Sequence, residues 1–166
     1  MEVYKNLPEG TLAELIENVI HMSPSPVTNH QKVLQTIFRR LSEQIEDRQK
    51  GEVIIAPFDV YLDETSNAVQ PDIVVILNTN EHKLDPNGHF NGVPDLIVEV
   101  LSAGNKEYDL VKKKDLYERF GVREYWIVDP QTKLTLGYAL KAGKYFKISE
   151  ESAHLRSLLL NFDFLF

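Results

Sequence analysis

Two extended apolar runs constrain the fold of this 166-residue chain more than any other feature of its sequence. The first spans residues 71–77 (PDIVVIL) and the second spans residues 94–101 (PDLIVEVL). Apolar runs without polar alternation are typical of strands that are buried on both faces. We therefore expect both runs to be central strands of a sheet whose two faces are covered.

Two segments have the apolar periodicity of helices. The first runs from about Val27 to Arg48, with Thr28 or Asn29 as the expected N-cap and Gly51 as its end. One face of this helix is apolar and consists of Leu34, Ile37, Phe38, Leu41 and Ile45. A second helix is expected from Lys106 to Phe120, closed by Gly121.

The remaining strands are shorter and lie on both sides of these segments. They are expected at residues 17–22, 52–56, 58–62 and 123–128, with a hairpin formed by residues 135–140 and 144–148. The apolar tail, residues 155–166, could be a last sheet edge or a dimer contact. This order of elements predicts an α/β (α+β) fold with a mixed central sheet flanked by helices, in a single domain over residues 1–166.

Composition excludes several classes of site. The chain has no cysteine, which excludes disulfides, thiolate nucleophiles and zinc–cysteine centres. We see no signal peptide and no apolar run near the ~20 residues of a membrane span, so we expect a cytoplasmic protein without membrane contact. The formal net charge of −7 disfavours nucleic-acid binding through neutralisation of many phosphates. Any nucleic-acid function must therefore rely on a local basic patch or on bound cations.

Glu99 and Asp72 are the first candidates for chemistry. Glu99 is the only charge inside its run, and it either points to water from an edge strand or is a buried carboxylate that needs a compensating partner. Asp72 begins the other run, where an acid is often only a turn residue. If the two strands are neighbours, the two acids can converge. Such a pair of oxygen ligands suits Mg²⁺ or Mn²⁺.

Lys113 falls near the middle of the apolar arc of the second helix, between Lys112 and Lys114. It either needs an anionic partner or reaches out to solvent, paired with Asp109 one turn earlier. His30 falls on the apolar face of the first helix, as a core or capping residue or as a group beside a metal. Asp95 shares a strand face with Glu99 and is a reserve ligand, although a strand-start acid is the simpler interpretation.

Four ordered motifs resemble the Uma2 family (DUF820) of the PD-(D/E)xK restriction-endonuclease-like superfamily. They are QPDIVVI at residues 70–76, VPDLIVEVLS at 93–102, the spacing of Asp109, Lys113 and Tyr117, and GVREYWIVDP at 121–130. The resemblance also includes the SPSP segment, residues 23–26, followed by His30, and it covers roughly residues 7–140.

The resemblance implies a restriction-endonuclease-like core and Mg²⁺-dependent hydrolysis of phosphodiester bonds, most directly of DNA. Asp72 and Glu99, with a backbone carbonyl such as that of Val100, would hold the metal. Lys113 would orient the attacking water or offset charge in the transition state.

The superfamily pattern has a lysine two residues after the second acid, where this chain has Leu101, and the recurrent lysine of the Uma2 family matches Lys113. His30 matches a recurrent position of the family and would support the site or contact phosphate. The leucine and the acidic net charge leave an alternative open, namely a catalytically inactive nuclease fold that binds nucleic acid or protein. A homodimer is compatible with both interpretations.

Overall fold

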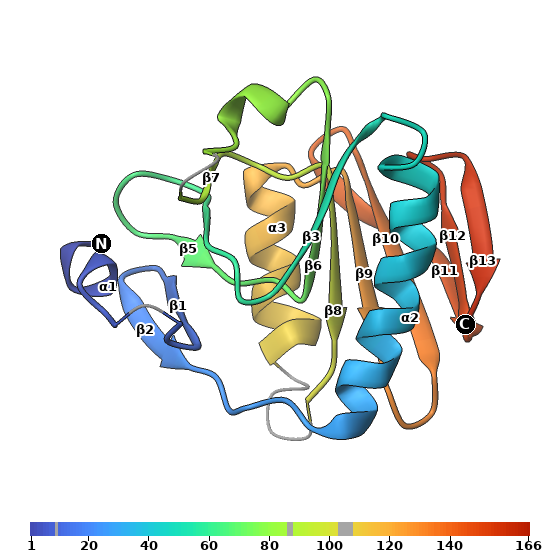
Figure 1. Cartoon of the computed structure of the whole chain (residues 1–166), viewed down its shortest axis with the longest axis horizontal. Helices are drawn as coiled ribbons and strands as arrows, with labels where there is room; N and C mark the ends of the chain where they lie inside the picture. The colour runs from blue at the N-terminus through green and yellow to red at the C-terminus, as the bar shows by residue number, and fades with distance from the viewer. Residues whose placement is uncertain (9, 86–87, 103–107) are drawn as a thin grey trace.

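A computed structural model describes residues 1–8, 10–85, 88–102 and 108–166 (Figure 1). Its elements are, in chain order, α1 (Glu2–Lys5), β1 (Ala13–Ile16), β2 (Val19–Met22), α2 (Thr28–Ile45), β3 (Gly51–Ile55), β4 (Val60–Tyr61), β5 (Ala68–Val69), β6 (Ile73–Leu77), the 3₁₀ turn η1 (Glu81–Lys83), β7 (Phe90–Asn91), β8 (Leu96–Val100), the π-helical turn η2 (Tyr108–Lys113), α3 (Lys114–Phe120), β9 (Glu124–Val128), β10 (Leu134–Lys141), β11 (Lys144–Ser152), β12 (His154–Ser157) and β13 (Phe162–Leu165).

The central sheet has six strands in the order β11-β10-β9-β8-β6-β3. Only the β8–β9 pair is parallel, and the other neighbours are antiparallel. All five residues of β8 are buried, as are four of the five residues of β6. The expected pair of central strands is therefore confirmed, in a mixed sheet with helices on its two faces.

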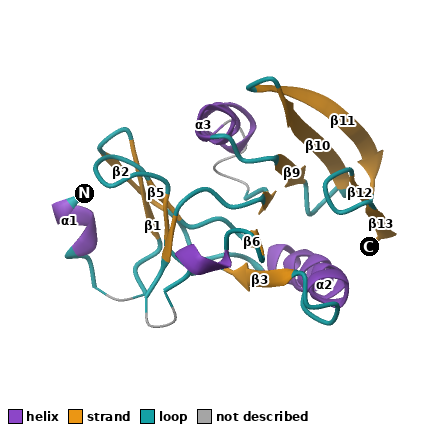
Figure 2. Cartoon of the chain, turned by 90° about the horizontal axis from the view of Figure 1, so that it is seen from above, coloured by secondary structure: helices purple, strands orange, loops and turns teal. Residues whose placement is uncertain are grey.

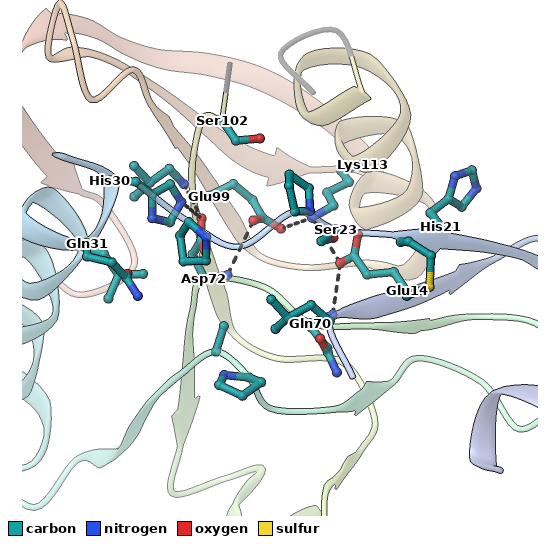
Figure 3. A pocket seen from close by; sticks show the side chains of 18 of the residues that line it. Glu14, His21, Ser23, His30, Gln31, Gln70, Asp72, Glu99, Ser102 and Lys113 are labelled. Atoms are coloured by element: carbon teal, nitrogen blue, oxygen red, sulfur yellow. Dashed lines mark hydrogen bonds and ion pairs between the residues drawn. The ribbon is translucent and has the colours of Figure 1, made fainter. Parts of the chain in front are cut away.

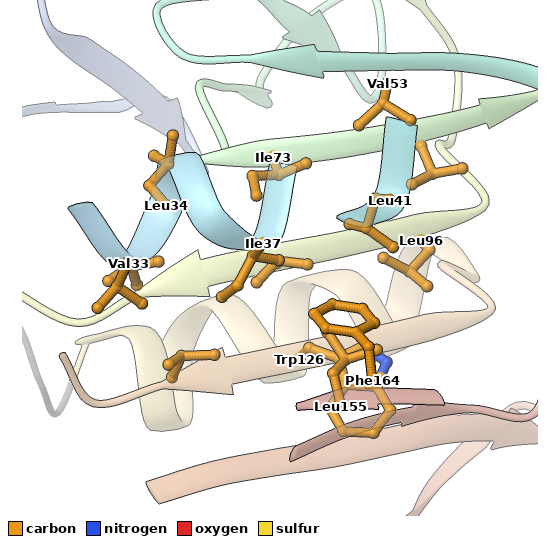
Figure 4. Packing of buried hydrophobic residues seen from close by; sticks show 14 of the residues in the cluster. Val33, Leu34, Ile37, Leu41, Val53, Ile73, Leu96, Trp126, Leu155 and Phe164 are labelled. Carbon is orange, nitrogen blue, oxygen red and sulfur yellow. The ribbon is translucent and has the colours of Figure 1, made fainter. Parts of the chain in front are cut away.

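Helix α2 covers one face of this sheet, and α3 covers the other (Figure 2). The apolar stripe of α2 packs on β6 and β8 as its spacing predicts, and Ile37 and Leu41 are completely buried there (Figure 4). The helix is shorter than expected at both ends. Its N-cap is Val27, which makes no side-chain capping bond, and Gly51 is the first residue of β3 rather than the end of the helix.

A second, smaller sheet has the order β2-β1-β5-β4-β7 and lies on the α3 side of the central sheet (Figure 2). The strand expected over residues 17–22 is wrong in its first two residues. Glu17 and Asn18 have φ values of 51° and 64°, so they form the tight turn of the β1–β2 hairpin. Residues 13–16 are the strand that the sequence analysis missed, and β1 is buried along its whole length.

The second helix differs from its prediction in its first turns. It begins as the π-helical turn η2 and continues as α3, and Gly121 ends it with φ 89°. The expected start at residue 106 lies outside the described residues. A π turn holds more residues than an α turn, so an α-helical wheel is only approximate before residue 114. The inward position of Lys113 is nevertheless confirmed, since this side chain is buried.

The C-terminal part forms two hairpins. The expected β10–β11 hairpin is confirmed, and the apolar tail pairs with itself as β12–β13. Leu155 and Phe164 of this tail pack into the core beneath α2 (Figure 4). His154 ties the two strand ends together, because its ring nitrogens bond Glu151 at 2.7 Å and Asp163 at 2.8 Å. The dimer contact expected from the tail stays a prediction.

No helix among the described residues is both long and apolar enough to cross a membrane.

Candidate active site

A cavity of about 490 Å³ opens at the end of the central sheet where β6 begins and β8 ends (Figure 3). The β1–β2 hairpin, the segment that follows it, the start of α2 and the end of η2 complete its walls. Among the polar side chains that line it are Glu14, His30, Gln70, Asp72, Glu99 and Lys113. The fold thus brings Asp72, Glu99, Lys113 and His30, which the sequence singled out, to one cavity.

Asp72 and Glu99 are direct cross-strand neighbours. The antiparallel register pairs Ile73 with Val98, and its continuation by one residue sets Asp72 opposite Glu99. The backbone N–H of Asp72 donates to Oε2 of Glu99 at 3.4 Å, and the N–H of Val100 donates to Oδ2 of Asp72 at 2.7 Å. The predicted convergence of the two acids is therefore present, and Glu99 does not point to water because its residue is only 3% exposed.

Lys113 compensates the charge of Glu99. Its Nζ lies 2.9 Å from Oε1 of Glu99 and 3.0 Å from Oε1 of Glu14, and all three residues are buried. The alternative of a solvent-reaching lysine is wrong. The side chain of Asp109, its suggested partner, lies outside the described residues. An ammonium held between two carboxylates is stabilised as a cation.

Tyr117 is the second group that fixes Glu99. Its hydroxyl donates to Oε1 of Glu99 at 2.9 Å, from one turn beyond Lys113 on the same helix. Complete burial raises the pKa of Tyr117 well above its ordinary value, and the Glu99 charge adds to this effect. Tyr117 thus stays a hydrogen-bond donor. Two donors on Oε1 turn the other oxygen of Glu99 toward Asp72 and the cavity.

Glu14 is a site residue that sequence reasoning missed. It is 3% exposed, and besides Lys113 it accepts a hydrogen bond from the backbone N–H of Gln70 at 3.0 Å. The available signal is the one that identified Glu99, a single charge within a short apolar segment, here residues 13–16. The strand expected from the sequence begins at residue 17, which leaves Glu14 outside the predicted element.

His30 lies in the first turn of α2, and its Nε2 is 3.1 Å from Oδ2 of Asp72. Burial lowers the pKa of His30, but the Asp72 carboxylate, Gln31 and the Val100 backbone together raise it by more, so the net pKa lies above its ordinary value. His30 therefore supports Asp72 through a charged or strongly polar contact.

Asp95 is placed elsewhere. It lies at the opposite end of β8, where it accepts hydrogen bonds from the Leu77 N–H at 2.9 Å and from Asn80 at 3.0 Å. Arg123 lies 3.3 Å from its other oxygen. The expectation of a reserve ligand is therefore corrected, since sharing a strand face with Glu99 does not bring Asp95 to the same end of the strand. It is a structural acid at a strand start.

The donor set fits a hard cation that takes few protein ligands. Among the described residues, no three His, Cys, Asp or Glu side chains form a ready metal cluster. Mg²⁺, however, commonly takes only one or two carboxylates and keeps several waters. The backbone provides a third oxygen, because the continued register sets Val100 opposite Pro71, which has no N–H to donate to the Val100 carbonyl. Asp72, Glu99 and this carbonyl form the oxygen-rich corner of the cavity.

Comparison with known proteins identifies the family of this chain. The profile of the Uma2 family, described as "Putative restriction endonuclease", matches residues 1–162. The chain belongs to the Uma2 family. A search of curated proteins finds no match.

A solved structure supports the Uma2 fold. The crystal structure of a putative nuclease belonging to DUF820, from Anabaena variabilis ATCC 29413, superposes with a TM-score of 0.77. The match covers 96% of this chain and 89% of that chain, at 18% sequence identity. At this identity the likeness shows a shared fold.

This Uma2 chain departs from the superfamily pattern at position 101. Leu101, at the position of the superfamily lysine, is 6% exposed and packs in the core on the α3 side of the sheet. The cation beside Glu99 comes instead from Lys113 in the following helical segment. The replacement is therefore spatial, with a different backbone position supplying the ammonium to the same carboxylate.

Proposed function

We propose that this protein is a Mg²⁺-dependent endonuclease that hydrolyses phosphodiester bonds of DNA. One observation carries the proposal: acids from adjacent central strands and a buried lysine meet in one cavity, within a chain of the Uma2 family. The carboxylates that line the cavity, those of Glu14, Asp72 and Glu99, outnumber its cationic groups. A phosphate needs an added cation to enter such a site.

Each residue has a distinct role in the proposed reaction. Asp72, Glu99 and the Val100 carbonyl would hold Mg²⁺, which when bound supplies Lewis-acid activation of the phosphate and of the attacking water. Lys113 is a fixed cation, suited to offset negative charge that develops on the phosphate or to orient the water. His30 positions Asp72 through its 3.1 Å contact.

Cleavage assays test these roles. Wild-type protein should cleave DNA in Mg²⁺ or Mn²⁺, and Asp72→Asn, Glu99→Gln and Lys113→Met should each lose about 100-fold or more in rate. Asp115→Asn is the matched control, because Asp115 is an exposed acid on the same helix and should leave the rate unchanged. Variants of all three site residues that cleave at the wild-type rate would refute the assignment.

Metal binding provides a second measurement that does not depend on turnover. Mg²⁺ at 100 times its dissociation constant should stabilise the wild-type protein by about 2.7 kcal/mol against unfolding. Glu99→Gln should abolish this gain, and Asp115→Asn should retain it.

The alternative is a catalytically inactive nuclease fold that binds nucleic acid or protein. The net charge of −7 and the leucine at position 101 favour it. It predicts DNA or protein binding with neither cleavage nor stabilisation by Mg²⁺. The two measurements above therefore separate the alternatives.

A further inference from the structure

The cavity has an apolar wall that hydrolysis of a phosphate does not require. Beside Glu14, the β1–β2 hairpin and the segments before and after it contribute Leu12, Ile20, Met22, Pro24 and Pro26 to the lining. Met22 is 65% exposed. A cavity lined by both carboxylates and apolar side chains fits an amphipathic ligand, and its 490 Å³ lies within the range of small-molecule sites. A single nucleotide has this character, with a charged phosphate and an apolar base face.

A furrow continues from this cavity along α2. Pro26, Gln31 and Leu34 line both the cavity and a neighbouring hollow of about 580 Å³. Phe38 of α2 and Ile55 of the edge strand β3 form the apolar part of this hollow. Phe38 also lines a third hollow, of about 320 Å³, farther along the helix.

The charges along the furrow favour a polyanion near the cavity and disfavour one at the far end. Lys32 is exposed at the second hollow and Arg39 at the third. The third hollow is also lined by acids, among them Glu43 and Glu46, which repel phosphate. The favourable stretch, from Gln31 to Phe38, is about 10 Å of helix at 1.5 Å per residue. An extended single strand spans more than the 3.4 Å per nucleotide of a duplex, so this stretch accommodates about two nucleotides.

These features suit an unpaired strand better than a duplex. In a duplex the base faces are stacked inside, so apolar side chains such as Phe38 and Met22 have no base face to contact. Single strands are bound by aromatic stacking combined with a few cationic contacts. A duplex is held mainly by many phosphate contacts, which a chain with a net charge of −7 does not favour.

We propose that this cavity and furrow bind a single-stranded segment of DNA, with one nucleotide in the cavity and about two along α2. This proposal rests on the proposed nuclease function and assigns its substrate class. Phe38 provides the stacking surface, and Lys32 contacts a phosphate.

Fluorescence anisotropy tests binding of a single strand to the cavity and furrow. Ca²⁺ replaces Mg²⁺ in this assay so that the DNA is not cleaved. The probes are a fluorescein-labelled 12-nucleotide single strand and the same strand in a duplex. We expect the single strand to bind at least tenfold more tightly. Phe38→Leu, which keeps an apolar side chain in the core, should weaken single-strand binding about fivefold or more. Lys32→Ala should reduce the slope of log affinity against log salt by about 0.7.

Two matched controls lie on the opposite edge of the sheet. Phe146→Leu changes a 43% exposed aromatic on β11, and Lys141→Ala changes an exposed lysine at the end of β10. Both should bind the single strand as the wild-type protein does. Equal or tighter binding of the duplex would refute the proposed single-strand site. Wild-type affinity of Phe38→Leu for the single strand would refute it as well. Cleavage of duplex DNA by a protein that fails these binding tests would leave the nuclease function standing, so the two failures are distinguishable.

Discussion

Lys113→Met is the substitution that most directly tests the electrostatics of the cavity. The Nζ of Lys113 lies 2.9 Å from Glu99 and 3.0 Å from Glu14, with all three residues buried. Methionine keeps the length and apolar stem of the side chain but removes the ammonium. The variant therefore isolates the charge from the packing.

The expected magnitude follows from the geometry. Without the ammonium, two carboxylates remain at most about 6 Å apart, and their repulsion is about 3 kcal/mol at an effective dielectric constant of 20. Breaking a buried ion pair by removing one partner costs about 3–5 kcal/mol. We expect Lys113→Met to lower the free energy of unfolding by about this amount at pH 7.

Urea denaturation followed by circular dichroism measures this change. Lys112→Met, an exposed neighbour on the same helical segment, should change stability by less than about 0.5 kcal/mol. Adding Glu14→Gln to Lys113→Met removes one of the two like charges and should restore about half of the loss or more. A Lys113→Met protein with the denaturation midpoint of Lys112→Met would refute the charge-compensating role.

Two further predictions concern the rest of the fold. Gly137→Ala should destabilise the protein by about 1–3 kcal/mol in urea denaturation, because a Cβ at this position would overlap the Trp126 ring, and a wild-type midpoint would contradict this packing. The His154 pKa lies above its ordinary value because Glu151 and then Asp163 accept its hydrogen bonds, so its stabilisation is complete below about pH 6.5 and is lost as pH rises through the raised value. The difference in unfolding free energy between wild type and His154→Gln should therefore shrink between pH 6 and pH 9, and a difference independent of pH would contradict it.

The central part of the fold was predictable because its signals are local and strong. The run that forms β6 is apolar over five residues and the run that forms β8 is apolar except for Glu99, which leaves few alternatives to a sheet covered on both faces. Glu99 and Lys113 could be identified for the same reason, since each is a charge at a position that the pattern buries. Their mutual contact could only be expected, because register and helix placement are properties of the folded chain.

The missed features depend on contacts between distant segments. Glu14 joins the site because β1 pairs with β5 rather than with its sequence neighbours alone, and a four-residue strand gives a weak periodic signal. Asp95 shows the converse error, since strand alternation gives the face of a side chain but not its distance along the strand. The tight turn at Glu17 and Asn18 has no glycine to mark it.

Pro71 has a consequence for the chemistry that the surrounding sheet can support. A residue with an amide hydrogen at this position would extend the β6–β8 pairing by one residue. Its N–H would donate a backbone hydrogen bond to the Val100 carbonyl. Proline ends the β6–β8 hydrogen bonding one residue earlier, so the Val100 carbonyl at this edge would be open to the proposed metal ion. Pro71 thus marks where the ladder ends, and Asp72, which follows it, places a carboxylate at that end of the sheet.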